Sequence, residues 1–217
     1  MEKIIPGVAK FRSEVFPERK HLFEKLATGQ EPRALFLTCA DSRIDPSLLT
    51  QTDPGELFIC RNAGNIVPPH TGQTGGMTAS IEYAVAVLNV PHIIVCGHTG
   101  CGAMTGAMDL EKVKSLRHVS EWLTYSEAAV AIVKENYPEA KPEEKLNLVI
   151  EQNVLLQIRH LETHPHVAAR LASRKIQLHG WVYNIGTGEV TAYDAAAGKF
   201  LPLPETAAAR ESAAGVS

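Results

Sequence analysis

Three short apolar runs constrain the fold of this chain more than any other feature. They cover residues 34–38, 57–60 and 92–96, and each ends at a polar or glycine-containing segment. Segments with helical periodicity separate and follow them. Strands that alternate with helices are typical of an α/β fold with a mainly parallel central sheet. Because the runs are continuously apolar, we expect their strands to be buried on both faces.

The other expected elements follow from periodicity and turn residues. Residues 176–185 alternate as a strand, and a Gly-Thr-Gly turn at 186–188 leads into residues 189–193, which predicts an antiparallel hairpin. We expect helices over residues 8–28 (interrupted near Pro17), 78–88, 103–136, 143–162 and, briefly, after Pro165.

The length and composition are those of one domain with a large core, since the chain has 217 residues and 45% of them are apolar. We expect residues 1–32 to form a helical arm, residues 33–205 an α/β core and residues 206–217 a loose tail. An amphipathic arm ahead of the first strand needs a surface to pack on. That surface belongs either to its own domain or to a second subunit.

The charge pattern excludes several kinds of partner. The net charge is −3, and no block of basic residues gives a footprint for nucleic acid. The longest apolar runs are too short to cross a bilayer, so we expect no membrane partner. Residues 1–6 lack the apolar centre of a secretory signal, which favours a cytoplasmic location.

Chemically active side chains gather at the ends of two expected strands. Cys39, Asp41 and Arg43 follow the first strand, and His98 and Cys101 follow the third in the pattern H-x-x-C. Sites in open α/β sheets form beyond the carboxyl ends of the strands. The fold therefore predicts that the two clusters meet.

Two thiolates and one imidazole form a ligand set suited to Zn²⁺. Structural zinc sites use four protein ligands, whereas catalytic sites typically use three and leave one position open. Cys39, His98 and Cys101 give three. Cys96 could be a fourth ligand and make the site structural, but its place inside an apolar run favours a core role. We interpret Cys60 as a core residue for the same reason.

Asp41 and Arg43 have two possible roles. They could form an ordinary surface ion pair, which stabilises little. Alternatively, Arg43 could hold Asp41 by a bidentate contact. An Asp41 held in this way would accept a hydrogen bond from metal-bound water instead of ligating the metal.

The pattern C-x-D-x-R followed by H-x-x-C resembles that of the β-class carbonic anhydrases. The resemblance continues through Arg61-Asn62-Ala63-Gly64-Asn65, residues 80–84 and residues 179–183, and so covers nearly the whole chain outside the tail. The chain is most similar to bacterial members of the plant-like type, including those encoded beside cyanate-degrading enzymes.

This resemblance implies a function and a set of site residues. The family's zinc ligands fall on Cys39, His98 and Cys101, with one zinc ion per subunit, and its catalytic Asp–Arg pair falls on Asp41 and Arg43. The implied enzyme is a carbonate dehydratase, a zinc lyase that converts carbon dioxide reversibly to bicarbonate and a proton. Zinc-bound hydroxide is the implied nucleophile. The implied assembly is a homodimer or a higher assembly of dimers.

The resemblance also implies a substrate pocket. Its glutamine, phenylalanine and tyrosine fall on Gln30, Phe58 and Tyr83, although Phe58 and Tyr83 would also suit the core. One group of the family has a bicarbonate-binding regulatory site with a tryptophan three residues before the first zinc cysteine. Phe36 occupies that position here, which favours a site without bicarbonate regulation.

Two other functions compete with this one. Cys39 or Cys101 could be a nucleophile activated by His98 and oriented by Asp41, but this leaves one cysteine without a role. A non-enzymatic module could use zinc structurally, with Cys96 as the fourth ligand. His70 and His118 are candidates for a proton shuttle only because imidazole titrates near neutral pH.

Overall fold

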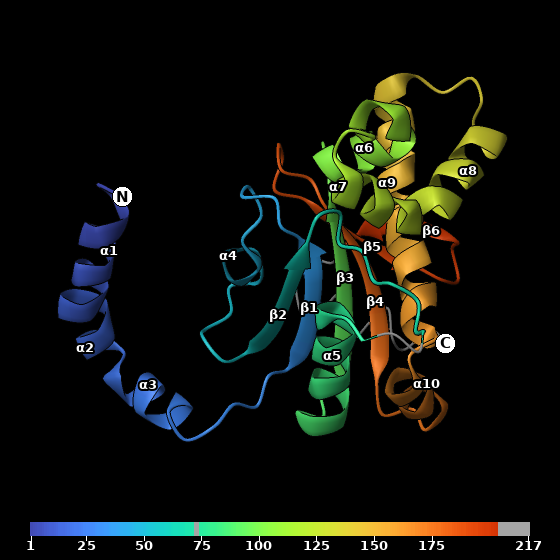
Figure 1. Cartoon of the computed structure of the whole chain (residues 1–217). Helices are drawn as coiled ribbons and strands as arrows, with labels where there is room; N and C mark the ends of the chain where they lie inside the picture. Colours follow the sequence, from blue (N-terminus) through green and yellow to red (C-terminus); the bar gives the residue numbers. More distant parts are fainter. Residues whose placement is uncertain (72–73, 204–217) are drawn as a thin grey trace.

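A computed structural model describes residues 1–71 and 74–203 (Figure 1). Its centre is a six-stranded sheet in the order β2-β1-β3-β4-β5-β6. The strands are β1 (Ala34–Cys39), β2 (Leu57–Asn62), β3 (His92–His98), β4 (Gln177–Tyr183), β5 (Val190–Asp194) and β6 (Lys199–Pro202). β2, β1, β3 and β4 are parallel to one another, and β5 pairs antiparallel with both β4 and β6. The expected α/β fold and its terminal hairpin are confirmed, with β6 as an additional strand.

The helices after β1 agree with the expected periodicity, except that one expected helix is divided, the helix expected over 78–88 continues as a π-helical turn (Tyr83–Val87) and one helix is added. They are α4 (Pro46–Thr50), α5 (Gly76–Glu82), α6 (Gly102–Met108), α7 (Arg117–Leu123), α8 (Glu127–Asn136), α9 (Pro142–Glu162) and α10 (Pro165–Ala172). The long segment expected over 103–136 is divided into α6, α7 and α8. The unexpected α4 begins where the Asp45 carboxylate accepts hydrogen bonds from the backbone N–H groups of Ser47 and Leu48.

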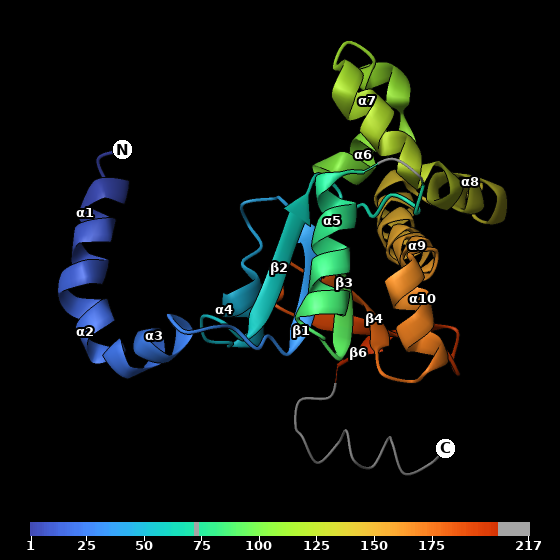
Figure 2. The same ribbon diagram turned by 60° about the horizontal axis from the view of Figure 1, so that its bottom comes forward.

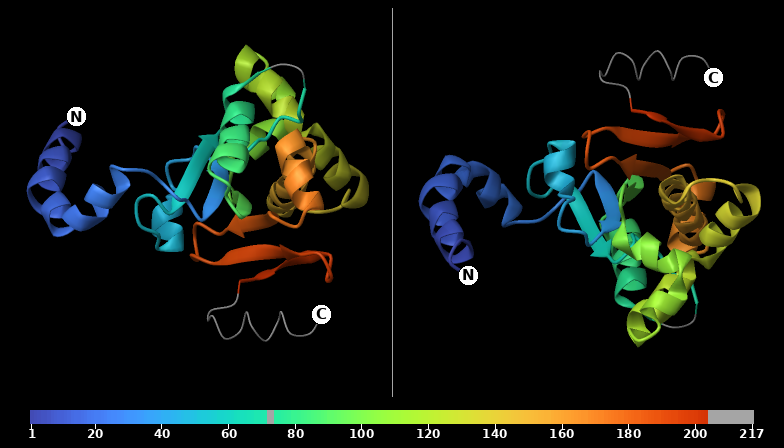
Figure 3. Two further views of the ribbon diagram at one scale, coloured as in Figure 1. Left: turned by 90° about the horizontal axis from the view of Figure 1, so that it is seen from below. Right: turned by 90° about the horizontal axis from the view of Figure 1, so that it is seen from above.

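Each face of the central strands packs against a different cluster. Leu35 and Leu37 point toward α5, α9 and α10, which lie on one side of the sheet (Figure 3). Phe36 points to the other face, where its ring meets that of Trp181. β1 and β3 are therefore buried on both faces as expected. The expectation is wrong for β2, because it is the edge strand and leaves Ile59 39% exposed.

A layer of helices covers the carboxyl end of the parallel strands. α6, α7 and α8 lie above this edge in Figure 1, and α9 runs from there along one face of the sheet. Cys39 and Cys101 pack there in a buried cluster that includes Met104 of α6 and Ile150 of α9. This layer encloses the ends of β1 and β3, where the chemically active residues lie.

The N-terminal arm stands apart from the sheet (Figures 1 and 2). It consists of α1 (Ile4–Lys10), a π-helical turn (Phe11–Val15), α2 (Phe16–Glu18) and α3 (Lys20–Leu26). The helix begins earlier than expected and is interrupted at Arg19, two residues after Pro17, in agreement with the interruption expected near Pro17. Pro17 is tolerated because it occupies the first turn of α2, after a π turn in which the N–H of Phe16 donates to Phe11.

Within the described residues, no helix is long and apolar enough to cross a membrane. The loose tail expected over 206–217 lies outside the described residues.

Close contact between α9 and β4 gives a test of the packing. A Cβ added at Gly180 would lie 2.9 Å from Cγ1 of Val154 and 3.0 Å from Cδ1 of Ile158. Gly180→Ala should therefore lower the free energy of unfolding by about 1–3 kcal/mol. Val154→Ala removes the closest of these atoms, so the double variant should lose less than the sum of the two single losses. Urea unfolding of all four proteins measures this coupling, and strictly additive losses would contradict the packing described.

Candidate metal centre

The backbone brings three ligand residues together. Cys39 ends β1, His98 ends β3, and Cys101 directly precedes α6. β1 and β3 are adjacent parallel strands, so their carboxyl ends lie side by side. Between His98 and Cys101 the chain turns at Gly100, whose φ of +63° suits glycine. The ligand atoms of the three side chains lie within 4.8 Å of one another, and all three residues are buried.

The His98 imidazole is oriented for metal binding. Its Nδ1 lies 3.0 Å from the carbonyl oxygen of Thr99, which makes Nδ1 the protonated nitrogen. Its Nε2 is buried and has no hydrogen-bond partner within the described residues. An unpaired buried nitrogen is costly, and a metal ion beside the two sulfurs would satisfy it. A histidine whose other nitrogen donates to a carbonyl is the usual arrangement at a metal site.

The two thiols form a close pair. Their Sγ atoms are 3.9 Å apart, and the backbone N–H of Gly64 donates to Cys39 Sγ at 3.4 Å. The hydrogen bond from Cys101 lowers the pKa of Cys39, with further lowering by His98 and by backbone N–H groups. The same hydrogen bond, together with burial, raises the pKa of Cys101. Cys39 is thus stabilised as a thiolate, the form that binds metal.

Asp41 and Arg43 are bound to each other beside this cluster. The Arg43 Nε donates to Asp41 Oδ1 at 2.8 Å and its Nη2 to Oδ2 at 2.6 Å. The hydrogen bonds from Arg43 hold the pKa of Asp41 well below its usual range. Arg43 Nη2 also donates to the carbonyl of Gly100 at 3.1 Å. Asp41 Oδ2 lies 3.7 Å from His98 Nε2, so this is no isolated surface pair.

Arg61 also contributes to the site, although it lies outside the C-x-D-x-R and H-x-x-C motifs. Arg61 lies near the carboxyl end of β2, at the same edge of the sheet as Cys39. Its Nε donates to the carbonyl of Cys39 at 3.0 Å. Its Nη2 donates to the carbonyl of Asp41 at 2.7 Å. Arg61 therefore fixes the backbone on both sides of Ala40. It belongs to the Arg-Asn-Ala-Gly-Asn segment, which was the one sequence signal that could have identified it.

The other two cysteines lie outside the metal cluster. Cys96 is completely buried on the face of the sheet opposite to Leu35 and Leu37, in a cluster with Phe36 and Ile94. Burial raises the pKa of Cys96 to about 12. Cys60 is partly buried and packs against the cluster on the helix-covered face. Both arrangements agree with core roles, and the ligand group in the described residues consists of three side chains.

The three expected pocket residues do not gather at the metal cluster of their own chain. Phe58 and Tyr83 contact each other, with ring centroids 6.0 Å apart. Phe58 is paired in register with Leu35, four residues before Cys39, which places it roughly 13 Å down the sheet. Tyr83 is 45% exposed. Gln30 lines an open pocket between α3 and the start of β1.

The candidate shuttle His70 packs against His164, with ring centroids 5.7 Å apart. Its backbone N–H donates to the side chain of Thr163, directly after α9. This end of α9 lies far from α6 and α7 in Figure 1. His118 lies on the exposed surface of α7. The structure thus places His70 at the opposite end of the sheet from the metal cluster.

Comparisons with known proteins identify the family. A carbonic anhydrase family model matches residues 34–190. The carbonic anhydrase of Pseudomonas aeruginosa is 46% identical over 205 residues, which cover 94% of this chain and 93% of that protein. The structure of the β-carbonic anhydrase CcaA superimposes with a TM-score of 0.91 at 43% identity, covering 94% of this chain and 99% of that one. The chain belongs to the β-class carbonic anhydrases.

Two further carbonic anhydrases agree with this assignment, one by its fold and one by its sequence. The enzyme from Coccomyxa, solved in complex with acetazolamide, gives a TM-score of 0.80 at 27% identity and covers 99% of this chain and 96% of that one. Carbonic anhydrase 1 of Escherichia coli O157:H7 is 46% identical over 94% of this chain and 92% of its own length. The family predicted from the sequence motifs is confirmed. Its activity is the interconversion of carbon dioxide and bicarbonate.

The half-buried His160 and the buried His164, beside the loop after β2, predict a pH dependence of stability. Burial lowers the pKa of His160 and His164, which are hydrogen-bonded to the carbonyls of Val67 and Pro68. Unfolded histidines titrate near about 6.5, so the unfolded chain binds more protons just below that pH. The free energy of unfolding should therefore fall as the pH is lowered through about 6.5, and level off below the folded pKa values.

His164→Gln should show a smaller fall than the wild type between about pH 7.5 and about pH 5.5. The measurement is urea unfolding at both pH values, with His118→Gln on the surface of α7 as the control. Equal falls in the wild type and His164→Gln would show that His164 does not carry the effect.

Proposed function

We propose that this chain is a zinc-dependent carbonic anhydrase, with one zinc ion per subunit held by Cys39, His98 and Cys101. The observation that carries the proposal is the buried set of three soft ligands with an unpaired His98 Nε2. Three protein ligands are typical of a catalytic zinc site, because the fourth position stays open. The positions of Cys60 and Cys96 support this count, since neither belongs to the group.

Bound zinc would supply hydroxide near neutral pH by lowering the pKa of water to about 7, an effect for which carbonic anhydrase is itself the standard example. We assign the orientation of this nucleophile to Asp41. Because Arg43 keeps the Asp41 carboxylate ionised, Asp41 can only accept a hydrogen bond. With zinc bound, an Asp41 that accepted the hydroxyl hydrogen would direct an oxygen lone pair toward carbon dioxide.

Arg43 has the second role in this proposal. It holds both Asp41 oxygens, through Oδ1 at 2.8 Å and Oδ2 at 2.6 Å. A carboxylate engaged in this way would stay beside a bound metal ion without ligating it. The bidentate geometry is stronger and more directional than a single charge contact. It supports a site in which water completes the ligand shell.

The position of Phe36 supports the plant-like type without bicarbonate regulation. Phe36 is fully buried, and its ring lies edge-on to Trp181 with centroids 6.1 Å apart. An apolar ring here offers no hydrogen-bond donor to an anion, unlike the indole N–H of a tryptophan.

We further propose that the carbon dioxide pocket is completed across a dimer. Gln30, Phe58 and Tyr83 lie away from the metal cluster of their own chain, and Tyr83 is exposed. A second copy could bring such residues to the metal cluster. Two β-carbonic anhydrases from Sordaria macrospora, one of which is 29% identical to this chain over 89% of its length, are described as tetrameric. A homodimer or an assembly of dimers is thus the proposed functional unit.

Substitution of one ligand residue distinguishes a zinc enzyme from a metal-free enzyme with a cysteine nucleophile. Wild type should carry about one zinc per chain and hydrate carbon dioxide. Cys39→Ser should lose most of its bound zinc and most of its hydration activity. The loss should exceed the roughly 10–100-fold fall in metal affinity or activity that follows from substitutions outside the ligand shell. Bound zinc is measured by atomic absorption and hydration by stopped flow. Cys60→Ser, outside the cluster, is the matched control and should behave as wild type. A wild type with stoichiometric zinc and no hydration at mildly alkaline pH would exclude the proposed activity.

Asp41→Asn tests the orienting carboxylate separately from metal binding. The amide has nearly the same shape but can donate a hydrogen bond where the carboxylate only accepts. The variant should keep its zinc and lose at least about 100-fold in kcat/KM for hydration. Zinc content and hydration rates are measured on the same preparations. Unchanged kinetics would remove Asp41 from the mechanism.

A further inference from the structure

A buried amide on α9 is connected to a metal ligand through one backbone residue. Asn153 lies within α9 and is fully buried. Its Nδ2 donates to the carbonyl oxygen of Gly64 at 3.0 Å. The N–H of the same Gly64 donates to Cys39 Sγ at 3.4 Å. The orientation of Gly64 therefore links the amide to the sulfur.

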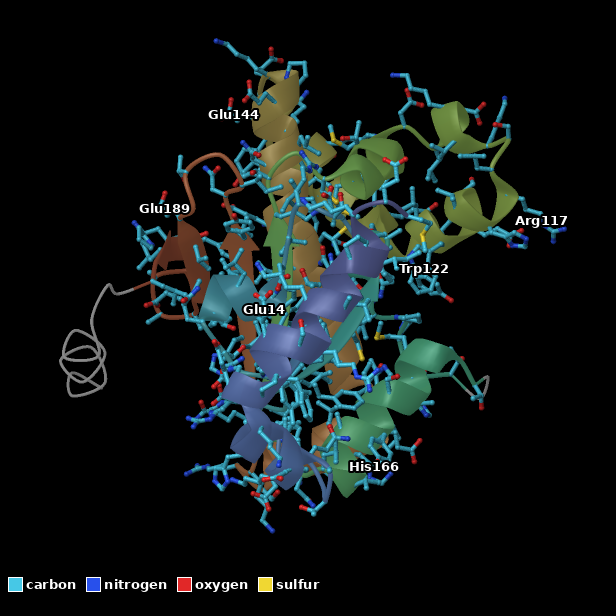
Figure 4. The ribbon with its side chains drawn as sticks, turned by 90° about the vertical axis from the view of Figure 1, so that its left-hand side faces the viewer. Glu14, Arg117, Trp122, Glu144, His166 and Glu189 are labelled. Carbon is cyan, nitrogen blue, oxygen red and sulfur yellow. The ribbon has the colours of Figure 1, made fainter. Side chains whose placement is uncertain are left out.

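Gly64 has little freedom to take another position. Its φ is +84°, a conformation that favours glycine. A Cβ here would lie 2.8 Å from Met104 Cε and 3.1 Å from Ala103 Cβ, so the backbone packs directly on α6. The preceding carbonyl, of Ala63, accepts a hydrogen bond from Trp122 Nε1 at 2.9 Å (Trp122 is labelled in Figure 4). Asn153 is the side chain that fixes the carbonyl of Gly64 itself.

The orientation of the Asn153 amide is in turn determined by two donors. Its Oδ1 accepts from Ser126 Oγ at 2.8 Å and from Gln157 Nε2 at 2.8 Å. Both of these residues are fully buried. Since Oδ1 serves two donors, Nδ2 must face Gly64. A buried polar network whose members are satisfied is rigid and holds one arrangement.

We propose that Asn153 is a positioning residue for the metal centre, because it holds the Gly64 N–H on the sulfur of Cys39. This inference rests on the metal site of the proposed function. A hydrogen bond to a ligating sulfur withdraws charge from it and fixes its direction. The bond therefore sets how strongly Cys39 donates to the metal. Partners outside the ligand shell typically contribute 10–100-fold to metal affinity or activity.

Two substitutions at Asn153 and one matched control test this role. Asn153→Leu removes the donor to Gly64 and leaves no room for a replacement water, whereas Asn153→Ala leaves such room. Ser126→Ala removes one donor from the same buried network but leaves the contact between Asn153 and Gly64 in place. The proteins are loaded with Co²⁺ for spectroscopy of the thiolate-to-metal charge-transfer band. Their zinc affinities are measured by competition with a chromophoric chelator.

Asn153→Leu should shift the charge-transfer band to longer wavelength, because the sulfur regains electron density. It should also weaken zinc binding by about tenfold or more. Asn153→Ala should shift the band and weaken zinc binding in the same directions, but by smaller amounts. If Asn153→Leu does not fold, Asn153→Ala carries the test. Ser126→Ala should lower the thermal midpoint. Because Gln157 Nε2 still donates to Asn153 Oδ1 in that variant, it should change the band and the zinc affinity less than Asn153→Ala does.

If Asn153→Leu or, should that variant not fold, Asn153→Ala has an unchanged band and a zinc affinity within about twofold of wild type, the positioning role is overturned. A wild type that binds neither Co²⁺ nor zinc would instead overturn the proposed metal site. The two failures are therefore distinguishable.

Discussion

The parallel pairing of β1 with β3 is the constraint on which the candidate metal centre depends. It places Leu37 opposite Val95 and Thr38 opposite Cys96, so both strands reach the same edge of the sheet together. Cys39 and His98 can then approach without any special loop between them. The burial of both strands on both faces fixes this register, since a shift by one residue would exchange the core faces. The packing of the apolar strands thus determines where the ligand residues lie.

Two arginine side chains fix the segments around the ligand residues, which strand pairing alone does not hold. Arg43 connects Asp41 to the carbonyl of Gly100, and so joins the segment after β1 to the turn before α6. Arg61, from the edge strand β2, binds the carbonyls of Cys39 and Asp41. Both guanidinium groups neutralise a region that contains a carboxylate and a thiolate. Their fork geometry also fixes directions, which a lysine at either position could not do.

The sequence predicted those features that depend on local pattern and parallel topology. The strands, the terminal hairpin and the meeting of Cys39 with His98 followed from apolar runs and the edge rule for α/β sheets. The exposure of β2 could not be predicted, because it depends on strand order. The short α4 and β6 carry too few residues for a periodic signal. Gln30 and Tyr83 were assigned by resemblance, and no single-chain pattern shows which surface they serve.

The role of α9 shows why some site residues leave no motif. Asn153 and Gly64 are 89 positions apart, and neither carries a side chain that could ligate a metal in the Cys39–His98–Cys101 group. What connects them is the packing of α9, since Val154 sits against Gly97 of β3 and Gly180 of β4. The close approach allowed by the two glycines sets the height of the helix over the sheet. That height places the amide of Asn153 at the loop after β2. Sheet packing and the environment of the Cys39 sulfur are thus determined by adjacent residues of one helix.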